Sequence, residues 1–379
     1  MTGHTMPAPA ALKENSDRSP SVSIRDVARE AGVSYQTVSR VINQSPSVKS
    51  STRETVLDAI ARLGFRPNRA ARALAGGPVQ SVTVLASNTS LYGFAAALEG
   101  IEEATREVGF GMAVRVVESI GPDDVRDAVE HALEPAGAVI VIAFDRPGVA
   151  ALECVPFDVP AAAMIPAPTE KEVPRRPSVW IDEYAAAMDA TRYLLGLGHE
   201  TVHHLSIPTW TGTTRRMSGW LAALKEARVP PPKPMHGGWS AEWGYEAGEK
   251  LARDLKVTAV LCGNDDIALG AMRAMHEAGR AVPADVSIVG FDDVPFARFY
   301  TPALTTVRQD FKALGRACFA TLMSFVDPAR AARGLELPEA RLVVRESAGP
   351  PPGAPRGSSQ RRGAPSLAGK RKRATAQRP

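Results

Sequence analysis

Short apolar segments alternate with helical segments through the middle of the chain, and this alternation restarts once. Between residues 79 and 165 four apolar runs are separated by stretches with helical periodicity, and the same succession begins again between residues 179 and 291. Strands that alternate with helices in this way form parallel sheets covered by helices. The sequence therefore predicts an α/β fold with two lobes in series, each a doubly wound parallel sheet. The predicted strands are 79–86, 112–117, 138–143, 161–165, 179–181, 202–207, 259–262 and 287–291.

Residues 23–64 follow a different pattern, that of three short helices. The first is predicted to begin at Ser23 and end at Gly32, and the second to begin after Ser34, because a serine hydroxyl can accept a hydrogen bond from an unpaired backbone N–H. The segment Ser51-Thr-Arg-Glu54 has the spacing of a capping box and predicts a third helix, which ends before Gly64. Apolar residues recur at intervals of three and four, so the helices can share one core in a headpiece over residues 21–66. The predicted core residues are Ile24, Val27, Ala28, Ala31, Val38, Val41, Ile42, Val56, Leu57, Ile60 and Leu63.

Residues 32–45 have the pattern of the turn and second helix of a helix-turn-helix, the element that enters the major groove of DNA. Tyr35, Gln36 and Arg40 fall on the face opposite the apolar stripe, near the start of the helix, where base-reading side chains sit. The alternative is an ordinary surface helix with scattered polar residues.

A shorter helical stretch over residues 67–77 follows the headpiece and starts near Asn68. A helix of this length is too short to be stable alone in water. We expect this hinge helix to form only when DNA and a second copy of the chain support it.

The basic residues are unevenly distributed along the chain. Residues 21–76 carry a net charge of +5 and residues 347–379 carry +8, whereas residues 1–20 are neutral. Because the whole chain carries +4, residues 77–346 must carry −9. The headpiece and the tail therefore have the charge that nucleic acid attracts, and the large central part does not.

Composition predicts a cytoplasmic chain with no metal and no cofactor. Cys154, Cys262 and Cys318 lie far apart, without the spacing of a metal or redox site. No signal peptide and no apolar stretch long enough to cross a membrane is found. Residues 1–20 and 347–379 are rich in Pro, Ala, Ser and charge and are predicted to be disordered. Residues 370–373, Lys-Arg-Lys-Arg, either add non-specific affinity for DNA or are simply solvated.

The run from Val22 to Gly76 resembles the DNA-binding and hinge region of the lac-repressor (LacI/GalR) family of bacterial transcription regulators. The Tyr35-Gln36 pair followed by Arg40 is most similar to the member from which the family takes its name. The resemblance implies that these side chains read base edges, with Arg40 suited to a bidentate contact with guanine. Leu74 matches a leucine that enters the minor groove and kinks it; the alternative is packing between hinge and core. The DNA-contacting residues that the resemblance implies are Ser34, Tyr35, Gln36, Thr37, Ser39, Arg40, Asn43, Asn68 and Leu74.

The two predicted lobes resemble the periplasmic-binding-protein-like core of the same family. The resemblance implies an effector-binding and dimerisation core over residues 78–346, with the ligand held in the cleft between the lobes. Crossing segments are expected near 164–180 and 300–310. Lobe 1 is expected to comprise residues 78–178 and 308–346, and lobe 2 residues 179–307.

Several segments of the core resemble ligand-contacting segments of the family. Arg216-Met-Ser-Gly-Trp220 matches a helix start whose arginine bonds ligand oxygens, and Trp239 matches a tryptophan that lies against the apolar face of a sugar. Asn264 and Asp292 match residues that bond sugar hydroxyls from turns after strands. The effector-binding residues that the resemblance implies are Leu91, Phe94, Arg216, Trp239, Asn264, Asp292, Gln309 and Phe311.

Three of these residues also have a simpler structural explanation. Asn264 could cap the helix that follows it, Trp239 could pack within its lobe, and Arg216 could pair with a nearby carboxylate. Taken together, however, separated segments supply ligand-binding residue types at strand ends, where open α/β sheets bind ligands.

Two segments depart from the family pattern. Residues 161–168 contain no acidic residue, whereas the member that names the family has an aspartate there that reads the sugar. This departure leaves open which sugar the cleft would accept, galactosides included. After Glu346 the chain lacks the leucine heptads that build a tetramer, so the resemblance implies a dimer.

The sequence and the resemblance together predict a repressor and not an enzyme. The core has no P-loop, no nucleophile elbow and no HExxH pair. His203 and His204 lie in a predicted strand, where neighbouring side chains face opposite ways, so the two cannot bind one metal ion together. The expected partners are a palindromic DNA operator, a second copy of the chain and a small sugar that releases the DNA. The alternative is a purine-like effector that acts as a co-repressor in the same cleft.

Overall fold

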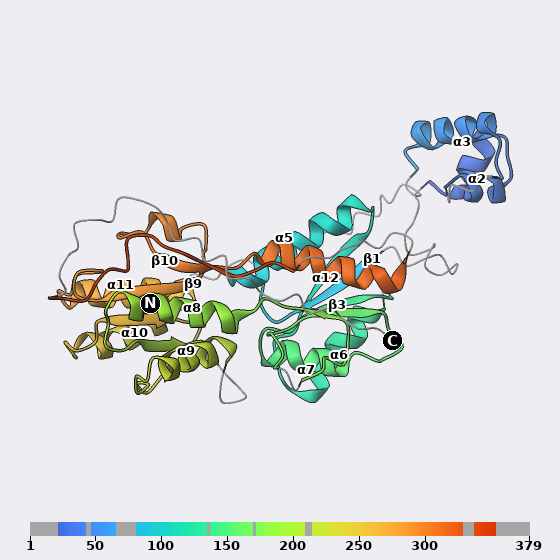
Figure 1. The fold of residues 1–379 in the computed structure, drawn as a ribbon. Coiled ribbons are helices and arrows are strands. Elements are labelled where there is room, and N and C mark those ends of the chain that lie inside the picture. The colour runs from blue at the N-terminus through green and yellow to red at the C-terminus, as the bar shows by residue number, and fades with distance from the viewer. Residues whose placement is uncertain are drawn as a thin grey trace, which may run out of the picture. The chain divides into compact units, whose positions relative to one another are not determined.

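The computed structural model describes residues 22–42, 47–65, 81–134, 137–169, 172–208, 214–328 and 337–353 (Figure 1). The chain divides after Pro78 into two compact units, a headpiece and a core. The predicted hinge helix over residues 67–77 lies outside the described residues, as do the predicted disordered residues 1–20. No helix in the described part of the chain is long and apolar enough to cross a membrane.

Three helices form the headpiece around one small apolar core. They are α1 (Ile24–Glu30), α2 (Tyr35–Ile42) and α3 (Ser50–Leu63). Ser23 caps α1 as predicted, because its Oγ accepts a hydrogen bond from the Asp26 N–H at 3.3 Å. The buried core residues are Val27, Ala28, Val38, Val41, Val56, Ala59 and Phe65.

The start of α3 differs from the prediction. The capping box predicted over residues 51–54 is wrong, because the N-cap residue is Lys49, two residues before Ser51, and it makes no side-chain cap bond. Leu57 was expected in the core and is 51% exposed, whereas Ala59 is buried. Val56, Ala59, Ile60 and Leu63 keep the three- and four-residue intervals of one helix face, and Leu57 lies beside that face.

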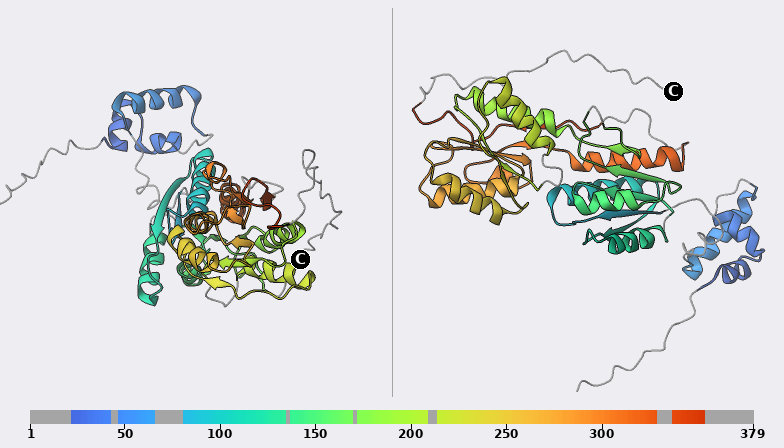
Figure 2. Two further views of the ribbon diagram at one scale, coloured as in Figure 1. Left: turned by 90° about the vertical axis from the view of Figure 1, so that its left-hand side faces the viewer. Right: turned by 90° about the horizontal axis from the view of Figure 1, so that it is seen from below.

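The first lobe is a five-stranded parallel sheet with helices on both faces (Figures 1 and 2). Its elements are β1 (Ser81–Ala86), α5 (Tyr92–Glu107), β2 (Gly111–Val116), α6 (Pro122–Leu133), β3 (Val139–Ile142), α7 (Arg146–Cys154), β4 (Ala161–Met164), β5 (Ser178–Val179) and α12 (Phe311–Val326). The strand order is β2-β1-β3-β4-β5. Side chains that alternate along a strand enter two separate cores: Val84 and Ile140 pack with α5 and α12, and Leu85 and Val141 pack with α6 and α7.

The second lobe repeats this plan with a six-stranded sheet. Its elements are α8 (Glu183–Gly196), β6 (His203–Ser206), α9 (Arg215–Glu226), β7 (Met235–His236), α10 (Ala241–Ala252), β8 (Ala259–Cys262), α11 (Asp265–Glu277), β9 (Ser287–Asp292), the 3-10 helix η1 (Ala297–Phe299), β10 (Thr305–Arg308) and β11 (Arg341–Val343). The strand order is β11-β10-β9-β8-β6-β7, and β11 alone runs antiparallel to its neighbour in this described sheet. Val260 and Ile288 pack with α10 and α11, whereas Leu261 and Val289 pack with α8 and α9.

The last part of the core is placed differently from the prediction. Residues 308–346 were expected in lobe 1. In the described part of this range α12 belongs there and Leu337 packs against its core, but β11 pairs with β10 at the edge of the second sheet. Residues 347–353, expected within the disordered tail, pack on lobe 2. Ser347 is fully buried, and its Oγ donates to the Ile288 carbonyl at 2.6 Å. The Ile288 N–H donates to the Ser347 carbonyl at 2.8 Å, and the Thr305 N–H donates to Ser347 Oγ at 2.8 Å. The segment therefore supplies hydrogen-bond partners to backbone groups where β9 and β10 begin.

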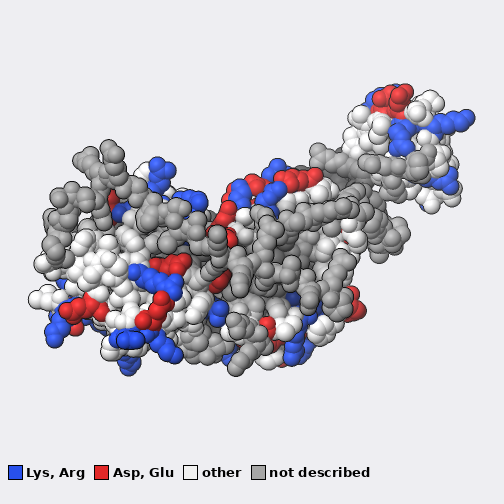
Figure 3. All heavy atoms as spheres, viewed as in Figure 1, with Lys and Arg blue, Asp and Glu red and all other residues white. Residues whose placement is uncertain are grey.

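Two helices of the first lobe, α5 and α12, begin beside the second lobe and lie against each other. A Cβ atom at Gly100 would stand 2.0 Å from the Lys312 carbonyl oxygen, so this close approach requires glycine. The Lys312 ammonium lies 2.8 Å from both Glu99 and Glu103, and Figure 3 shows acidic and basic side chains interspersed along these helices. The packing of α5 against α12 determines the positions of the first residues of both helices.

Candidate functional site

The second helix of the headpiece exposes the residues predicted to read DNA. Tyr35 is 57% exposed, and Gln36 and Arg40 are exposed as well, while the apolar face of α2 is buried. At the start of the helix, Ser34 Oγ accepts a hydrogen bond from the Thr37 N–H at 3.1 Å. The headpiece therefore holds the polar face of α2 outward. The other predicted DNA contacts are Ser39, which is half-buried, and Asn43, Asn68 and Leu74, which lie outside the described residues.

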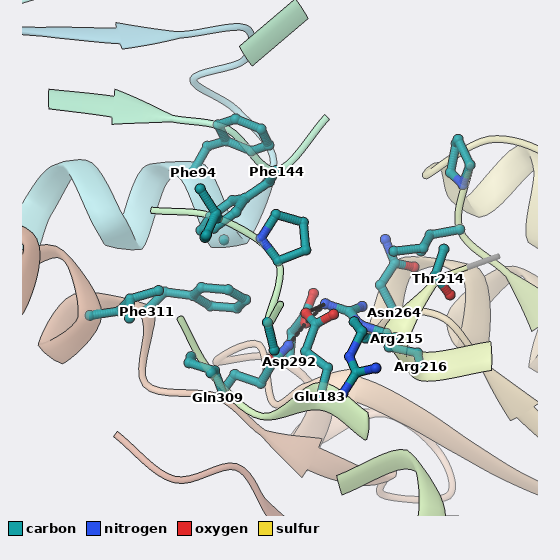
Figure 4. Close-up of a pocket in the computed structure, with 18 of the residues that line it drawn as sticks. Phe94, Phe144, Glu183, Thr214, Arg215, Arg216, Asn264, Asp292, Gln309 and Phe311 are labelled. Carbon is teal, nitrogen blue, oxygen red and sulfur yellow. Dashed lines mark hydrogen bonds and ion pairs between the residues drawn. The ribbon is translucent and has the colours of Figure 1, made fainter. Parts of the chain in front are cut away.

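A cavity of about 530 Å³ is lined by both lobes of the core. A volume of this size is typical of sites that hold a small molecule. All eight residues predicted to contact an effector line this one cavity, although they come from segments far apart in the sequence (Figure 4). They are Leu91, Phe94, Arg216, Trp239, Asn264, Asp292, Gln309 and Phe311.

Arg216 is the centre of the polar side of the cavity. It is the second residue of α9, and its guanidinium lies over the ring of Phe291, 4.6 Å from the ring centroid. Nη2 donates to Glu183 Oε1 at 2.7 Å and lies 3.5 Å from Asp292 Oδ1, and Nη1 donates to the Gly263 carbonyl. The carboxylate pairing considered as an alternative for Arg216 is therefore present, in a side chain that also lines the cavity.

Asp292 ends β9 with its carboxyl group on the cavity. Gln309 Nε2 donates to Asp292 Oδ1 at 2.8 Å. Burial raises the pKa of Asp292 to about 7, although the charge of Arg216 and the hydrogen bond from Gln309 act in the opposite direction. Its backbone φ of 111° is unusual for a residue with a side chain, and such conformations concentrate at functional sites. Near neutral pH this carboxyl group is poised between its two protonation states.

Asn264 has a structural role in addition to its place on the cavity. Its Oδ1 accepts a hydrogen bond from the Ile267 N–H at 2.8 Å, which caps α11, and its Nδ2 donates to the Trp239 carbonyl at 2.9 Å. Trp239 is half-buried and packs against the core of lobe 2. Asn264 therefore caps a helix and Trp239 packs within its lobe, as the structural alternatives predicted. Both residues nevertheless line the same side of the cavity.

Aromatic rings line the cavity on the side of the first lobe. The centroids of Phe94 and Phe144 are 5.4 Å apart in an edge-to-face arrangement, and those of Phe144 and Phe311 are 5.9 Å apart. Tyr92 meets Phe311 edge-on at 6.1 Å. Residues 165–168, which follow β4 and lack the acidic residue of the family pattern, also line this side. Figure 4 shows Phe94, Phe144 and Phe311 on one side and polar side chains such as Arg216 and Asn264 on the other.

Comparison with known proteins decides the family. Residues 23–68 match the model of bacterial regulatory proteins of the lacI family, and residues 191–348 match the periplasmic-binding-protein-like domain. The chain is 33% identical to the lactose operon repressor of Escherichia coli over 330 residues. This alignment covers 86% of this chain and 90% of that protein. The chain belongs to the lacI family. It is a DNA-binding transcription regulator with a LacI-type helix-turn-helix and a periplasmic-binding-protein-like core.

Other members of the lacI family are also similar to the chain. The crystal structure of the lac repressor dimer bound to operator and the anti-inducer ONPF has a TM-score of 0.76 at 32% identity, and covers 87% of this chain and 99% of that one. A complex of the regulator CelR with cellobiose has a TM-score of 0.62 at 27% identity, with coverages of 86% and 100%. The repressor PurR of Pasteurella multocida is 30% identical over 331 residues, 86% of this chain and 98% of that protein.

The cavity is also lined by side chains that the sequence did not single out, and Tyr92, Phe144, Glu183 and Asp266 are among them. Phe144 follows β3 and Glu183 is the first residue of α8 after β5, so the rule that ligands bind beyond strand ends was sufficient to find both. Tyr92 directly follows the predicted site residue Leu91, and Asp266 is two residues after Asn264.

No group of three or more His, Cys, Asp or Glu side chains placed to hold a metal occurs in the described part of the chain. Of the two adjacent histidines, His204 is stacked on Trp220, away from the cavity lining. Burial lowers the pKa of His204 to about 4, so it is neutral at physiological pH.

Proposed function

We propose that this lacI-family regulator is a repressor that binds a palindromic operator as a homodimer and releases it when a small saccharide enters the cavity. The observation that carries the proposal is the set of hydrogen-bonding side chains, Arg216, Asp292, Asn264 and Gln309, that converge on one cavity beside Trp239.

The headpiece supports the DNA half of the proposal. Tyr35 and Gln36 are exposed at the start of α2, and Arg40 is exposed on the next turn. An arginine there can make two parallel hydrogen bonds to a guanine edge, which no other base pair offers in the same pattern. A homodimer presents two such helices to two half-sites, so a palindromic operator follows from the two-fold symmetry.

The chemistry of the polar side supports a saccharide. A sugar hydroxyl both donates and accepts, so a carboxylate and a guanidinium that lie 3.5 Å apart can bind one hydroxyl or two adjacent ones. Trp239 supplies an apolar ring surface next to these groups, which suits the C–H face of a pyranose.

The position of the cavity supports control of DNA binding by the ligand. Both lobes line it, so a ligand that contacts both favours one arrangement of the lobes over another. Such a ligand shifts DNA binding only by its difference in affinity for the two arrangements. A hundredfold weakening of operator binding requires about 2.7 kcal/mol of coupling, within the usual range.

A second candidate is a purine-like co-repressor. The rings of Phe94, Phe144 and Phe311 on the cavity favour it, because a planar base packs well against aromatic side chains. The similarity to PurR repressors is in keeping with this candidate.

The two candidates are separated by fluorescence anisotropy of the purified protein on labelled DNA from its own upstream region, at fixed salt. Mono- and disaccharides, then purine bases, are titrated into the complex. We expect one saccharide to release the DNA. Tighter binding in the presence of a purine, with no release by any saccharide, would replace the first candidate with the second.

A further inference from the structure

The basic residues that follow Gly353 belong neither to the headpiece nor to the cavity, and we propose that they form a second DNA-binding element. We call residues 354–379 the basic tail. It binds a duplex other than the one that the headpiece holds, so the regulator bridges two segments of DNA. This second contact is independent of the effector in the cavity.

The composition of the basic tail favours a polyanion as its partner. The tail contains eight Lys or Arg residues and no Asp or Glu, and Leu367 is its only Leu, Ile, Val, Met or aromatic residue. A segment with so little apolar surface has little to gain from an apolar groove. Lys and Arg bind the phosphates of DNA and release its counterions, and the headpiece of the same chain already matches a DNA-binding domain. The eight basic residues are Arg356, Arg361, Arg362, Lys370, Arg371, Lys372, Arg373 and Arg378.

The segment that precedes the basic tail is fixed to the second lobe. The Gly349 N–H donates to Ser287 Oγ at 2.9 Å, and Nε2 of the buried His199 lies 3.0 Å from the Gly349 carbonyl oxygen. Burial lowers the pKa of His199, so its ring is neutral at physiological pH and its single N–H is available for this bond. With the bonds of Ser347, these contacts hold the chain where β9 begins.

The basic tail and the headpiece are tethered at opposite ends of the core. The cavity lies at the carboxyl ends of the strands of both lobes, where Phe144 and Asp292 stand. The chain enters lobe 1 at Ser81, the first residue of β1, and leaves lobe 2 beside the first residue of β9. In Figure 1 these points lie toward opposite ends of the core, β1 in cyan and residues 347–353 in red. Strands of six residues such as β1 and β9 are each about 20 Å long, so the two tethers are at least about 40 Å apart.

Separate tethers allow two duplexes to be bound at once. A duplex that the basic tail contacts beyond lobe 2 does not have to displace the one that the headpiece binds. Residues 77–346, which lie between the headpiece and the tail in the sequence, carry a net charge of −9 and do not attract DNA, so capture of the second duplex depends on the tail. Contacts to phosphates read no base edges, so the second duplex can have any sequence.

The test is capture of a second duplex by an isolated protein–DNA complex. The full-length protein is bound to a short duplex from its own upstream region, and the complex is isolated by gel filtration. It is then titrated into a fluorescent duplex of unrelated sequence, and binding is followed by anisotropy. If the tail contacts four phosphates, we expect the affinity for this second duplex to fall about 150-fold between 50 and 200 mM salt, since each contact adds about 0.9 to the log–log slope. No capture at the lower salt would overturn the inference.

Two variants assign the capture to the basic tail. Replacing all eight of its Lys and Arg residues by Gln should weaken capture of the second duplex at least about tenfold and leave the affinity for the upstream duplex unchanged. The matched control combines Lys370→Arg with Lys372→Arg, which keeps the charge, and should capture the second duplex as the wild type does.

Three results of the Gln variant would overturn the inference. Capture equal to that of the wild type would show that the basic tail does not hold the second duplex. A parallel loss of affinity for the upstream duplex would show that the tail contacts the same DNA as the headpiece. Tighter capture would show that the tail covers the acidic core instead of binding DNA.

Discussion

The protonation of Asp292 predicts a pH dependence of effector binding that can be worked out in advance. Its pKa of about 7 is set by burial, which raises it, against Arg216 and Gln309, which lower it; Glu183 and Asp266 add to the increase. Sugar hydroxyls that donate to this group bind the ionised carboxylate. With that pKa, about one molecule in eleven is ionised at pH 6 and about ten in eleven at pH 8. Effector affinity should therefore fall about tenfold from pH 8 to pH 6, equivalent to about 1.4 kcal/mol.

The assay is calorimetric titration of DNA-free protein with the releasing saccharide at several pH values between 6 and 8. Asp292→Asn keeps the shape of the side chain without its charge, so this variant should bind more weakly and lose the pH dependence. Asp158→Asn, at an exposed aspartate that does not line the cavity, is the control and should keep it. An affinity that does not change between pH 6 and pH 8 in the wild type would refute the reasoning, as would an unchanged pH dependence in Asp292→Asn.

Three further predictions concern the headpiece, the hinge and the cavity. Arg40→Ala should cost roughly 1–3 kcal/mol of operator affinity and relax specificity at one base pair, measured by anisotropy on an operator library; an equal loss on every sequence would make Arg40 a phosphate contact. Leu74→Ala should reduce operator bending in a gel-mobility or energy-transfer assay, because the side chain that we propose wedges between base steps is lost; unchanged bending would remove this role from Leu74. Trp239→Ala should abolish the effector response while operator affinity stays within a factor of two or so; a surviving response would contradict the contact between Trp239 and the ligand.

The alternation of strands and helices was sufficient to predict the two-lobed α/β fold, because buried parallel strands such as β1 and β9 are short and mostly apolar segments. It was not sufficient to place β11. That strand has three residues, and its side chains are exposed or half-buried, so its position depends on pairing with Val307 and its neighbours in β10. Pairing of this kind between distant segments leaves no periodic signal in the sequence. The buried Ser347 was missed for the same reason, because a Pro- and Gly-rich segment is typical of disorder unless distant backbone groups, here at the beginnings of β9 and β10, are present to bond it.

The cavity could be predicted in part. Residues of types that bind sugars at strand ends, such as Asn264 and Asp292, were found from the sequence, and the structure brings them together. The ring of Phe144 was not found, because a phenylalanine that follows an apolar strand is indistinguishable from a core residue until the neighbouring segments are in place. Arg216 and Glu183 lie on different helices and are 33 residues apart in the sequence. No rule of sequence spacing predicts that such residues pair.

The central claim is that ligand binding between the lobes and DNA binding by the headpiece are coupled. The most direct test is to measure the dissociation constant of the operator with and without saturating saccharide, and that of the saccharide with and without saturating operator. Because coupling between two binding equilibria is reciprocal, we predict that the two ratios are equal and well above one. If the saccharide binds with the same affinity whether or not the operator is bound, the cavity does not control DNA binding and the account is contradicted.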